Sequence, residues 1–510
     1  MKNLKIFSLG LALVTLLSGC SSSFLDSEMN GASMTQEEYE SIDGTFVATV
    51  VGLYPSLYNY GGDHMTFGQK SLDIANDLTS GDMALTTFGY GWFSTDASLQ
   101  SYASRNSQLW STGYATIKNA NGVIYQYYKM EQDSVAFTPE DMSAYAQALT
   151  MRAYYYFQML YLFSTSIADQ TPNTRYGGAG GNDFRLIPYY DGSDAQINQE
   201  TGFIAEQDLS TFGFIYEKIR EDLTKAIFLF DAAQYPRALK LYFDGDVARG
   251  ILAYTLLHSR NPETQLEDYE LAYDLAKTII DSGKYPMLKY DEVLTNGFND
   301  INSANWMWGH DLTIDNSTGL ASFFGHMDRF TYGYGGINQG LFAIDDNFYA
   351  ELDSTDIRKQ WFDPSDLGNL WKFYDPERIS MGDRDWLNDL VYMRVEEMYL
   401  IAAEAAWRSG NSAEAVNVLK QLVVERNPKA EITESNIKEQ IYYNWRIEFW
   451  GEGKSLMTLK RFDMPEKERG SNHYAYKEQP VSYSSFYLRY TIPYSEYSQN
   501  PSITYTDIIQ

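Results

Sequence analysis

The chain has 510 residues, enough for a large hydrophobic core, and 68 Asp and Glu against 39 Lys and Arg give it a formal net charge of -29. Because such a surface repels a polyanion, the composition argues against nucleic acid as a partner. Aromatic residues make up 15% of the chain, with 42 tyrosines, and most of these rings are expected to pack in the interior.

Residues 1–20 have the pattern of a lipoprotein signal peptide. Two lysines precede an apolar run from Ile6 to Leu17, which is too short for a membrane-spanning helix. The run ends in LSGC, which resembles a bacterial lipoprotein cleavage site, and Cys20 is the only cysteine in the chain. The resemblance implies that Cys20 becomes the lipidated first residue and anchors the mature protein to a membrane without crossing it. The polar, unpatterned residues 21–33 are then a flexible tether, and residues 34–510 form a single domain.

Apolar residues at helical spacing predict a mostly α-helical domain. The clearest helix start is the segment TPED at 138–141, in which a capping threonine is followed by proline and two acids. The predicted helices are Thr35–Leu57 with a break at Pro55, Leu109–Tyr128, Thr138–Phe163, Phe212–Phe230, Asp246–His258, Tyr269–Asp281 and Ser435–Trp450.

The most distinctive segment, Val391–Asn427, predicts two amphipathic helices joined by a short turn. Gly410 supplies a left-handed stop, and Asn411 begins the second helix as its cap. Such a hairpin cannot bury its apolar face alone, so a stack of about four tetratricopeptide-like hairpins is expected. Ion pairs one helical turn apart are expected for Arg394 with Glu397, Glu404 with Arg408 and Glu221 with Lys225.

Two long stretches lack the helical pattern. In the first, His64–Asp96, glycines flank Tyr90 and Trp92 and are expected to hold them in irregular backbone. The second, Tyr285–Asp389, is about a hundred residues long and contains several tryptophans. A structureless insertion of that size in a compact domain is usually a functional surface. The ligand site is therefore expected in these loop-rich stretches.

Seven segments in order resemble the conserved blocks of the SusD/RagB family of outer-membrane lipoproteins. The family implies a mostly α-helical scaffold with loop-rich insertions that carry the ligand site. The segments are LWSTGYATIKNANGVI (109–124), AQALTMRAYYYFQMLYLFS (146–164), YEKIREDLTKAI (216–227), GDVARGILAYTLL (245–257), Arg394 with EEMYLIAAEA (396–405), NWRIEFWGEGKSLMTLKRF (444–462) and YTIPYSEYSQNPSI (490–503).

The resemblance implies a glycan-binding subunit on the cell surface, anchored in the outer membrane. Its expected partner is a SusC-like TonB-dependent transporter, to which it delivers oligosaccharides. Sugar rings stack on aromatic side chains, and their hydroxyls bind planar polar groups. Carried onto this sequence, the family's site implies Trp92, Trp306, Trp308, Tyr332 and Tyr334 for stacking and Asp73 and Asn76 for hydroxyl groups.

Enzyme and metal chemistry have little support in the sequence. Five scattered histidines form no metal-binding pair, and no phosphate-binding or dinucleotide-binding loop is complete, so no cofactor is expected. A glycoside hydrolase could hide its two carboxylates among the 68 acids, but the helical repeats and the family resemblance favour binding over catalysis. A peptide-binding or protein-binding scaffold remains the alternative, because stacked hairpins often present a groove to a partner chain.

Overall fold

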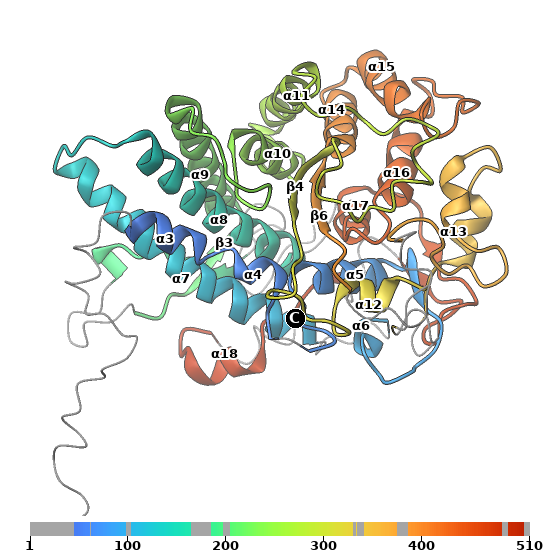
Figure 1. Ribbon diagram of the computed structural model, residues 1–510, viewed down its shortest axis with the longest axis horizontal. Coiled ribbons are helices and arrows are strands. Elements are labelled where there is room, and N and C mark those ends of the chain that lie inside the picture. The colour runs from blue at the N-terminus through green and yellow to red at the C-terminus, as the bar shows by residue number, and fades with distance from the viewer. Residues whose placement is uncertain are drawn as a thin grey trace, which may run out of the picture. The chain divides into compact units, whose positions relative to one another are not determined.

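The computed structural model describes residues 45–61, 63–97, 104–164, 185–196, 205–329, 333, 341–374, 386–481 and 488–503. Two units divide the chain, Met1–Ala48 and Thr49–Gln510, and only the second is described at length. Helices predominate throughout it (Figure 1). They are α3 (Thr45–Val51), α4 (Pro55–Tyr58), α5 (Gln69–Ser80), α6 (Ser94–Ala97), α7 (Ser104–Gln132), α8 (Pro139–Phe163), α9 (Phe212–Ala233), α10 (Gly245–Leu256), α11 (Gln265–Asp281), α12 (Phe323–Met327), α13 (Asp346–Glu351), α14 (Val395–Arg408), α15 (Ser412–Val423), α16 (Ile437–Glu448), α17 (Ser455–Arg461) and α18 (Tyr494–Gln499).

Helices that follow one another in the chain pack side by side and form the predicted hairpin scaffold. Helix α8 packs against α7 and α9, α10 against α9 and α11, and α14 against α11 and α15. Figure 1 shows this row passing from α7–α9 through α10 and α11 to α14–α16. The mostly α-helical fold class predicted from the sequence is confirmed.

The helix boundaries predicted from capping residues are also confirmed where the signals are strong. Thr138 accepts a hydrogen bond from the backbone of Asp141 and completes a capping box at the start of α8. Gly410 has a φ of 87° at the end of α14, and Asn411 accepts from the backbone of Glu414 at the start of α15.

Helix α5 contradicts the prediction that His64–Asp96 is irregular. All twelve of its residues are buried, including Asp73, Asn76 and Asp77. Eight of the twelve residues are polar, a composition more usual in exposed segments than in an enclosed helix, so the sequence did not reveal it. Helix α5 contacts α4, α6, α7, α17 and strand β1 (Met83–Leu85). It therefore connects the stretch His64–Asp96 to α17, which lies late in the chain.

Short antiparallel strand pairs attach the irregular insertion to the scaffold. Strand β1 pairs with β5 (Phe342–Ile344), and β4 (Trp306–His310) pairs with β6 (Leu390–Arg394). The first four residues of the predicted hairpin are therefore strand rather than helix, and α14 begins only at Val395. Two further pairs join β2 (Arg185–Pro188) to β3 (Leu209–Thr211) and β7 (Lys467–Glu468) to β8 (Pro480–Val481). Short 3-10 helices cover Asp194–Gln196 and Ile357–Trp361.

Of the three ion pairs predicted within helices, only Glu404–Arg408 is present, at 2.7 Å. Lys225 instead reaches Glu131 on α7, and Glu221 pairs with Lys218. Arg394 lies at the end of β6 rather than inside a helix, so it cannot pair with Glu397 along a helix face. Its guanidinium instead contacts Glu448 at 2.7 Å and Glu452 at 3.0 Å.

The core around Glu448 is held by a buried ionic cluster. Three guanidinium groups surround this carboxylate, from Arg394 at 2.7 Å, Arg426 at 2.9 Å and Arg358 at 3.0 Å. Burial alone would raise the pKa of Glu448, but the three arginines hold it well below its usual value. The cluster joins α16 to the strand β6, to the end of α15 and to the insertion.

Candidate functional site

Aromatic side chains concentrate in the loop between β1 and α6, residues 86–93, which we call the aromatic loop. Phe88 and Tyr90 are 57% and 61% exposed, and Trp92 is half-buried beside them. Phe93 is buried and anchors the loop against Phe67 and Phe342. The loop therefore presents rings to solvent from a fixed base, as the glycine spacing predicted.

Two positive φ angles produce this conformation. Gly91 has a φ of 84°, where an added Cβ would also lie 3.1 Å from the ring of Phe88, so only glycine fits without strain. Phe93 has a φ of 58°, which is rare for an aromatic residue. Its backbone N–H donates to the sulfur of Met65, and the hydroxyl of Ser94 donates to the carbonyl of Gly91. Backbone strain of this kind is often found at functional loops.

Trp92 is the centre of a packed ring cluster. The imidazole of His64 stacks on its indole at 3.9 Å between centroids, and Tyr90 lies against it at 4.9 Å. His326 from α12 meets its edge at 5.7 Å and lies 3.4 Å from the ring nitrogen of His64. The stretch His64–Asp96 and the insertion therefore meet at Trp92.

The two histidines of the cluster are neutral near pH 7. Burial lowers the pKa of His326 to about 3, and burial also lowers the pKa of His64. An uncharged cluster presents apolar ring faces without a fixed positive charge. Such faces suit the C–H surface of a sugar ring.

Trp306 and Trp308 do not take part in this surface. They lie on β4 and are 0% and 1% exposed, and the indole of Trp308 donates to the carbonyl of Leu241. Rings enclosed in this way offer no face to a ligand at the aromatic loop, so the structure does not support their predicted role in stacking there. Sequence reasoning treated the whole insertion as irregular loop and missed the buried strand within it.

The predicted hydroxyl partners are also enclosed. Asp73 and Asn76 on α5 are 6% and 1% exposed. Asp73 accepts hydrogen bonds from Gln69 and Lys70, and Asn76 accepts one from the hydroxyl of Tyr490. With their oxygens bound inside the protein, neither reaches the aromatic loop. Together with Trp308 they line a small cavity of about 40 Å³, and their role toward a ligand stays a prediction. Tyr332, Tyr334 and Cys20 lie outside the described residues.

Sequence reasoning missed three neighbours of Trp92. His64, His326 and exposed Asp63 lie beside the ring cluster, and Asp63 raises the pKa of His64 while burial lowers it. No spacing connects His64 with His326, since 262 residues separate them. Only the fold brings them together.

The described residues also line two cavities away from the aromatic loop. A groove of about 780 Å³ runs along α7 and is lined by Trp110, Tyr114, Tyr125 and Tyr190. A polar pocket of about 680 Å³ lies between α13, α16 and β7. Among the described residues, no group of three acidic, histidine or cysteine side chains is placed to hold a metal ion, and no helix has the length and apolar character needed to span a membrane.

Comparisons with known proteins agree with the fold. Residues 23–253 match a family described as "Starch-binding associating with outer membrane", and residues 296–506 match the SusD family. No curated protein matches the chain.

Solved structures of similar fold include a SusD-like carbohydrate binding protein from Bacteroides vulgatus, which is 23% identical, with a TM-score of 0.71 over 91% of this chain and 97% of that chain. A SusD superfamily protein from Bacteroides thetaiotaomicron is 19% identical, with a TM-score of 0.70 over 90% and 98% of the two chains. NanU from B. fragilis is 14% identical, with a TM-score of 0.64 over 93% and 98%. Because the two family matches together span most of the chain and the solved structures share its helical scaffold, the chain belongs to the SusD/RagB family.

Proposed function

We propose that this protein is a cell-surface lipoprotein that captures oligosaccharide or polysaccharide at the aromatic loop and delivers it to a SusC-like TonB-dependent transporter in the outer membrane. The exposed rings of Phe88 and Tyr90, supported by Trp92, are the observation that carries the proposal. Aromatic faces that stand out from a rigid base suit the apolar faces of sugar rings. The protein binds its ligand without chemical turnover, and lipid on Cys20 anchors it to the membrane.

The binding test compares single alanine variants in a calorimetric titration with glycans. Trp92→Ala and Tyr90→Ala are expected to weaken binding by roughly tenfold or more, because each removes a large apolar contact. Tyr128→Ala, which truncates a 48% exposed ring on α7, is the matched control and should bind as the unmodified chain does. Equal affinity in all four proteins would contradict the proposed site.

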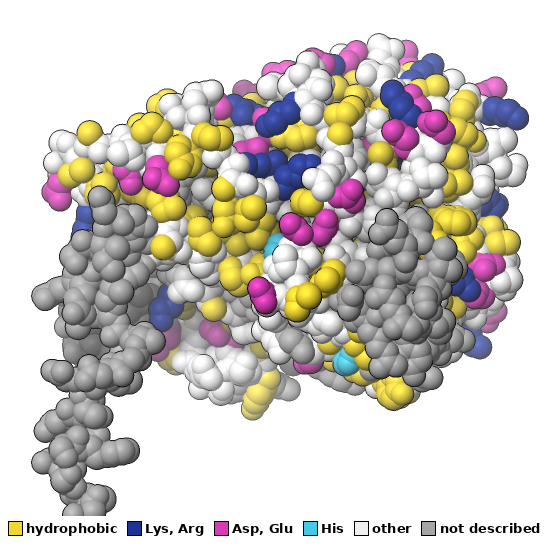
Figure 2. All heavy atoms as spheres, viewed as in Figure 1, with side chains coloured by type: hydrophobic (Ala, Val, Ile, Leu, Met, Phe, Trp, Pro, Cys, Tyr) yellow, Lys and Arg dark blue, Asp and Glu magenta, His cyan; other side chains and the backbone are white. Residues whose placement is uncertain are grey.

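Exposed apolar side chains on the hairpin helices are the proposed contact with the transporter. On α9, Phe214 and Phe228 are 47% and 69% exposed, and hydrophobic side chains gather over α7–α9 in Figure 2. Phe228→Ser should reduce co-purification with the transporter, whereas Ile314→Ser, an 82% exposed residue of the insertion, should not. Unchanged co-purification of the Phe228 variant would contradict the proposal that this surface contacts the transporter.

The groove along α7 favours the alternative of a peptide ligand, because its aromatic residues lie mainly on a helix rather than in a loop. The hydroxyls of Tyr114 and Tyr125 are bound to Pro188 and Asp194, which leaves their rings as the available surface. If Tyr125→Ala abolished binding and Trp92→Ala did not, the site would be the groove and the peptide alternative would be favoured.

A further inference from the structure

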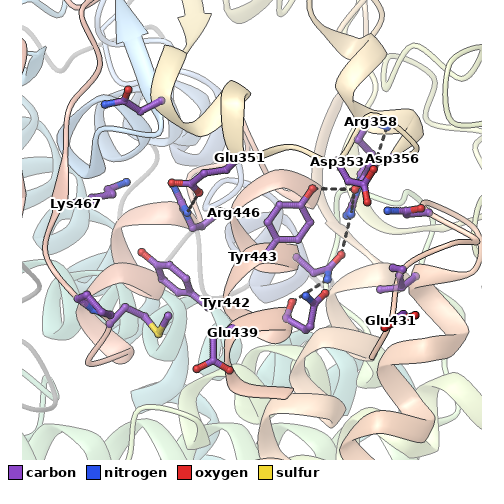
Figure 3. A pocket seen from close by; sticks show the side chains of 18 of the residues that line it. Glu351, Asp353, Asp356, Arg358, Glu431, Glu439, Tyr442, Tyr443, Arg446 and Lys467 are labelled. Atoms are coloured by element: carbon purple, nitrogen blue, oxygen red, sulfur yellow. Dashed lines mark hydrogen bonds and ion pairs between the residues drawn. The ribbon is translucent and has the colours of Figure 1, made fainter. Parts of the chain in front are cut away.

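The polar pocket between α13, α16 and β7, which we call the α16 pocket, lies on elements that the aromatic loop does not use (Figure 3). Its volume of about 680 Å³ is within the range of sites for small organic ligands. The side chains that line it are mainly polar, and they come from helices α13 and α16 as well as from the segment 464–468. The pocket is therefore a candidate for a second ligand site.

A hydroxyl that faces the α16 pocket without a partner among the described residues points to a ligand here. Tyr442 is 7% exposed and extends into the α16 pocket (Figure 3), yet among the described residues its hydroxyl makes no hydrogen bond. Burial raises its pKa, so the group remains an un-ionised hydroxyl that can donate and accept. The adjacent Tyr443 differs, since its hydroxyl donates to Asp356. The Tyr442 hydroxyl is therefore open to the pocket, where a ligand hydroxyl can bond to it.

The basic residues of the α16 pocket are already neutralised by the protein. Arg446 contacts Asp82 at 2.8 Å and Glu351 at 3.2 Å, and Lys467 also contacts Asp82. Arg358 lies 2.7 Å from Asp356. None of these cations is available to attract an anionic ligand.

The rim of the α16 pocket, in contrast, carries unneutralised negative charge. Five exposed acids border it, and within the described part of the chain none makes an ion pair: Asp353, Glu431, Glu439, Glu466 and Glu468. No three acidic, histidine or cysteine side chains of the described residues come close enough to hold one metal ion. Carboxylates that are spread around a wide pocket fit a larger organic cation instead.

Amide groups complete the set of polar partners. Gln440 lines the pocket with a side chain that can donate and accept hydrogen bonds. Asn427 adds amide N–H donors only, because its side-chain oxygen already accepts from the Thr355 hydroxyl and the Lys429 backbone. Together with Tyr442 they match a ligand that is rich in hydroxyl groups. The acidic rim matches a positive charge on the same ligand.

We propose that the α16 pocket binds a polyhydroxylated ligand that carries a primary ammonium group, of the amino-sugar class. Sugar hydroxyls bond to Tyr442 and to the amides of Gln440 and Asn427, and the ammonium group is held by the rim carboxylates. Acidic sugars are repelled, and N-acetylated sugars lose the ionic contribution. This second site goes beyond the proposed capture of glycan at the aromatic loop and does not depend on it.

The test is a calorimetric titration of the full chain at pH 6.5 with a glucosamine trimer and, separately, with its N-acetylated counterpart. The two probes share length and linkage and differ in charge. We expect the glucosamine trimer to bind roughly tenfold more tightly. Tyr442→Phe should weaken its binding by roughly three- to tenfold, the effect of one lost hydrogen bond. Glu439→Gln should weaken it by roughly two- to fivefold.

Matched variants separate this pocket from general attraction to an acidic protein. Tyr128→Phe removes a hydroxyl from an exposed tyrosine of α7, and Glu270→Gln neutralises an exposed acid of α11 that has no ion pair among the described residues. Neither should change the affinity, and Trp92→Ala should leave this binding intact even if it abolishes binding at the aromatic loop. The proposal is overturned if the trimer shows no saturable binding, if the N-acetylated trimer binds equally well, or if the control variants lose as much affinity as the pocket variants. Spermidine, a cation without hydroxyl groups, is a third probe. The proposal is also overturned if spermidine binds as tightly as the glucosamine trimer and Tyr442→Phe changes the affinity for neither of the two ligands.

Discussion

At the scale of single residues, Glu448 shows how much depends on one buried charge. It is 0% exposed and is shared by three buried arginines, each of which also has another acidic partner: Glu452 for Arg394, Glu396 for Arg426 and Asp356 for Arg358. Removing one partner of a buried ion pair is costly, since the remaining charges stay desolvated.

Glu448→Gln should therefore lower the free energy of unfolding by about 3–5 kcal/mol, as measured by denaturant titration. Glu439→Gln on the same helix is the control, because Glu439 is exposed and should change stability by less than about 0.5 kcal/mol. A similarly small decrease in the free energy of unfolding in both variants would mean that the buried ionic cluster does not stabilise the core.

Glu452, which belongs to the same cluster, should make the stability of the protein depend on pH. Burial alone would raise its pKa, but Arg394 and Lys372 lower it to about 2 from an ordinary value of 4.5. A carboxyl with a lowered pKa in the folded state stabilises the protein above pH 4.5, and that contribution disappears as the pH falls from 4.5 towards 2. The free energy of unfolding, measured across this range, should fall less steeply in Glu452→Gln than in the unmodified chain. Parallel curves would contradict the assignment.

At the scale of helices and loops, replacing Gly410 or Gly122 by alanine should change the stability of the protein in opposite directions. Nothing lies within 4 Å of an added Cβ at Gly410 or at Gly122, but Gly410 has a φ of 87° whereas Gly122 lies within α7. Gly410→Ala should therefore lower the free energy of unfolding by about 1 kcal/mol through backbone strain. Gly122→Ala should raise it by about 0.5–1 kcal/mol. Thermal unfolding of the two variants checks the signs, and a stabilised Gly410 variant would refute the left-handed stop.

The elements that could be predicted from the sequence are those with a local signal. Caps, proline and one-sided apolar stripes predicted α8, α9 and the α14–α15 hairpin, because those helices are partly exposed or begin with a strong start signal. Strand β4 is enclosed on every side and has no polar face to mark its period, and α5 buries eight polar residues that would ordinarily be exposed. The same limit applies to the candidate site. Flanking glycines indicated Trp92, but the positions of Asp73, Trp306 and His326 depend on contacts between distant parts of the chain.

At the scale of the whole molecule, the net charge of -29 should influence which glycans are captured. On the face shown in Figure 2, acidic and basic side chains are interspersed, and no single acidic patch stands out there. A polysaccharide rich in uronic acid should bind more weakly than a neutral one of similar length. The difference should shrink as salt is raised from about 50 to 500 mM, because salt screens long-range repulsion. A salt-independent preference would point to a specific contact instead.

The most direct test of glycan capture is calorimetric titration of a soluble, unlipidated chain that begins after Cys20, against a panel of neutral and charged polysaccharides. The mixtures are analysed afterwards for shortened products. The account predicts saturable binding to at least one glycan without turnover, and loss of that binding in Trp92→Ala but not in Tyr128→Ala. Shortened products would identify an enzyme. Binding that survives Trp92→Ala, or no binding to any glycan, would contradict capture at the aromatic loop.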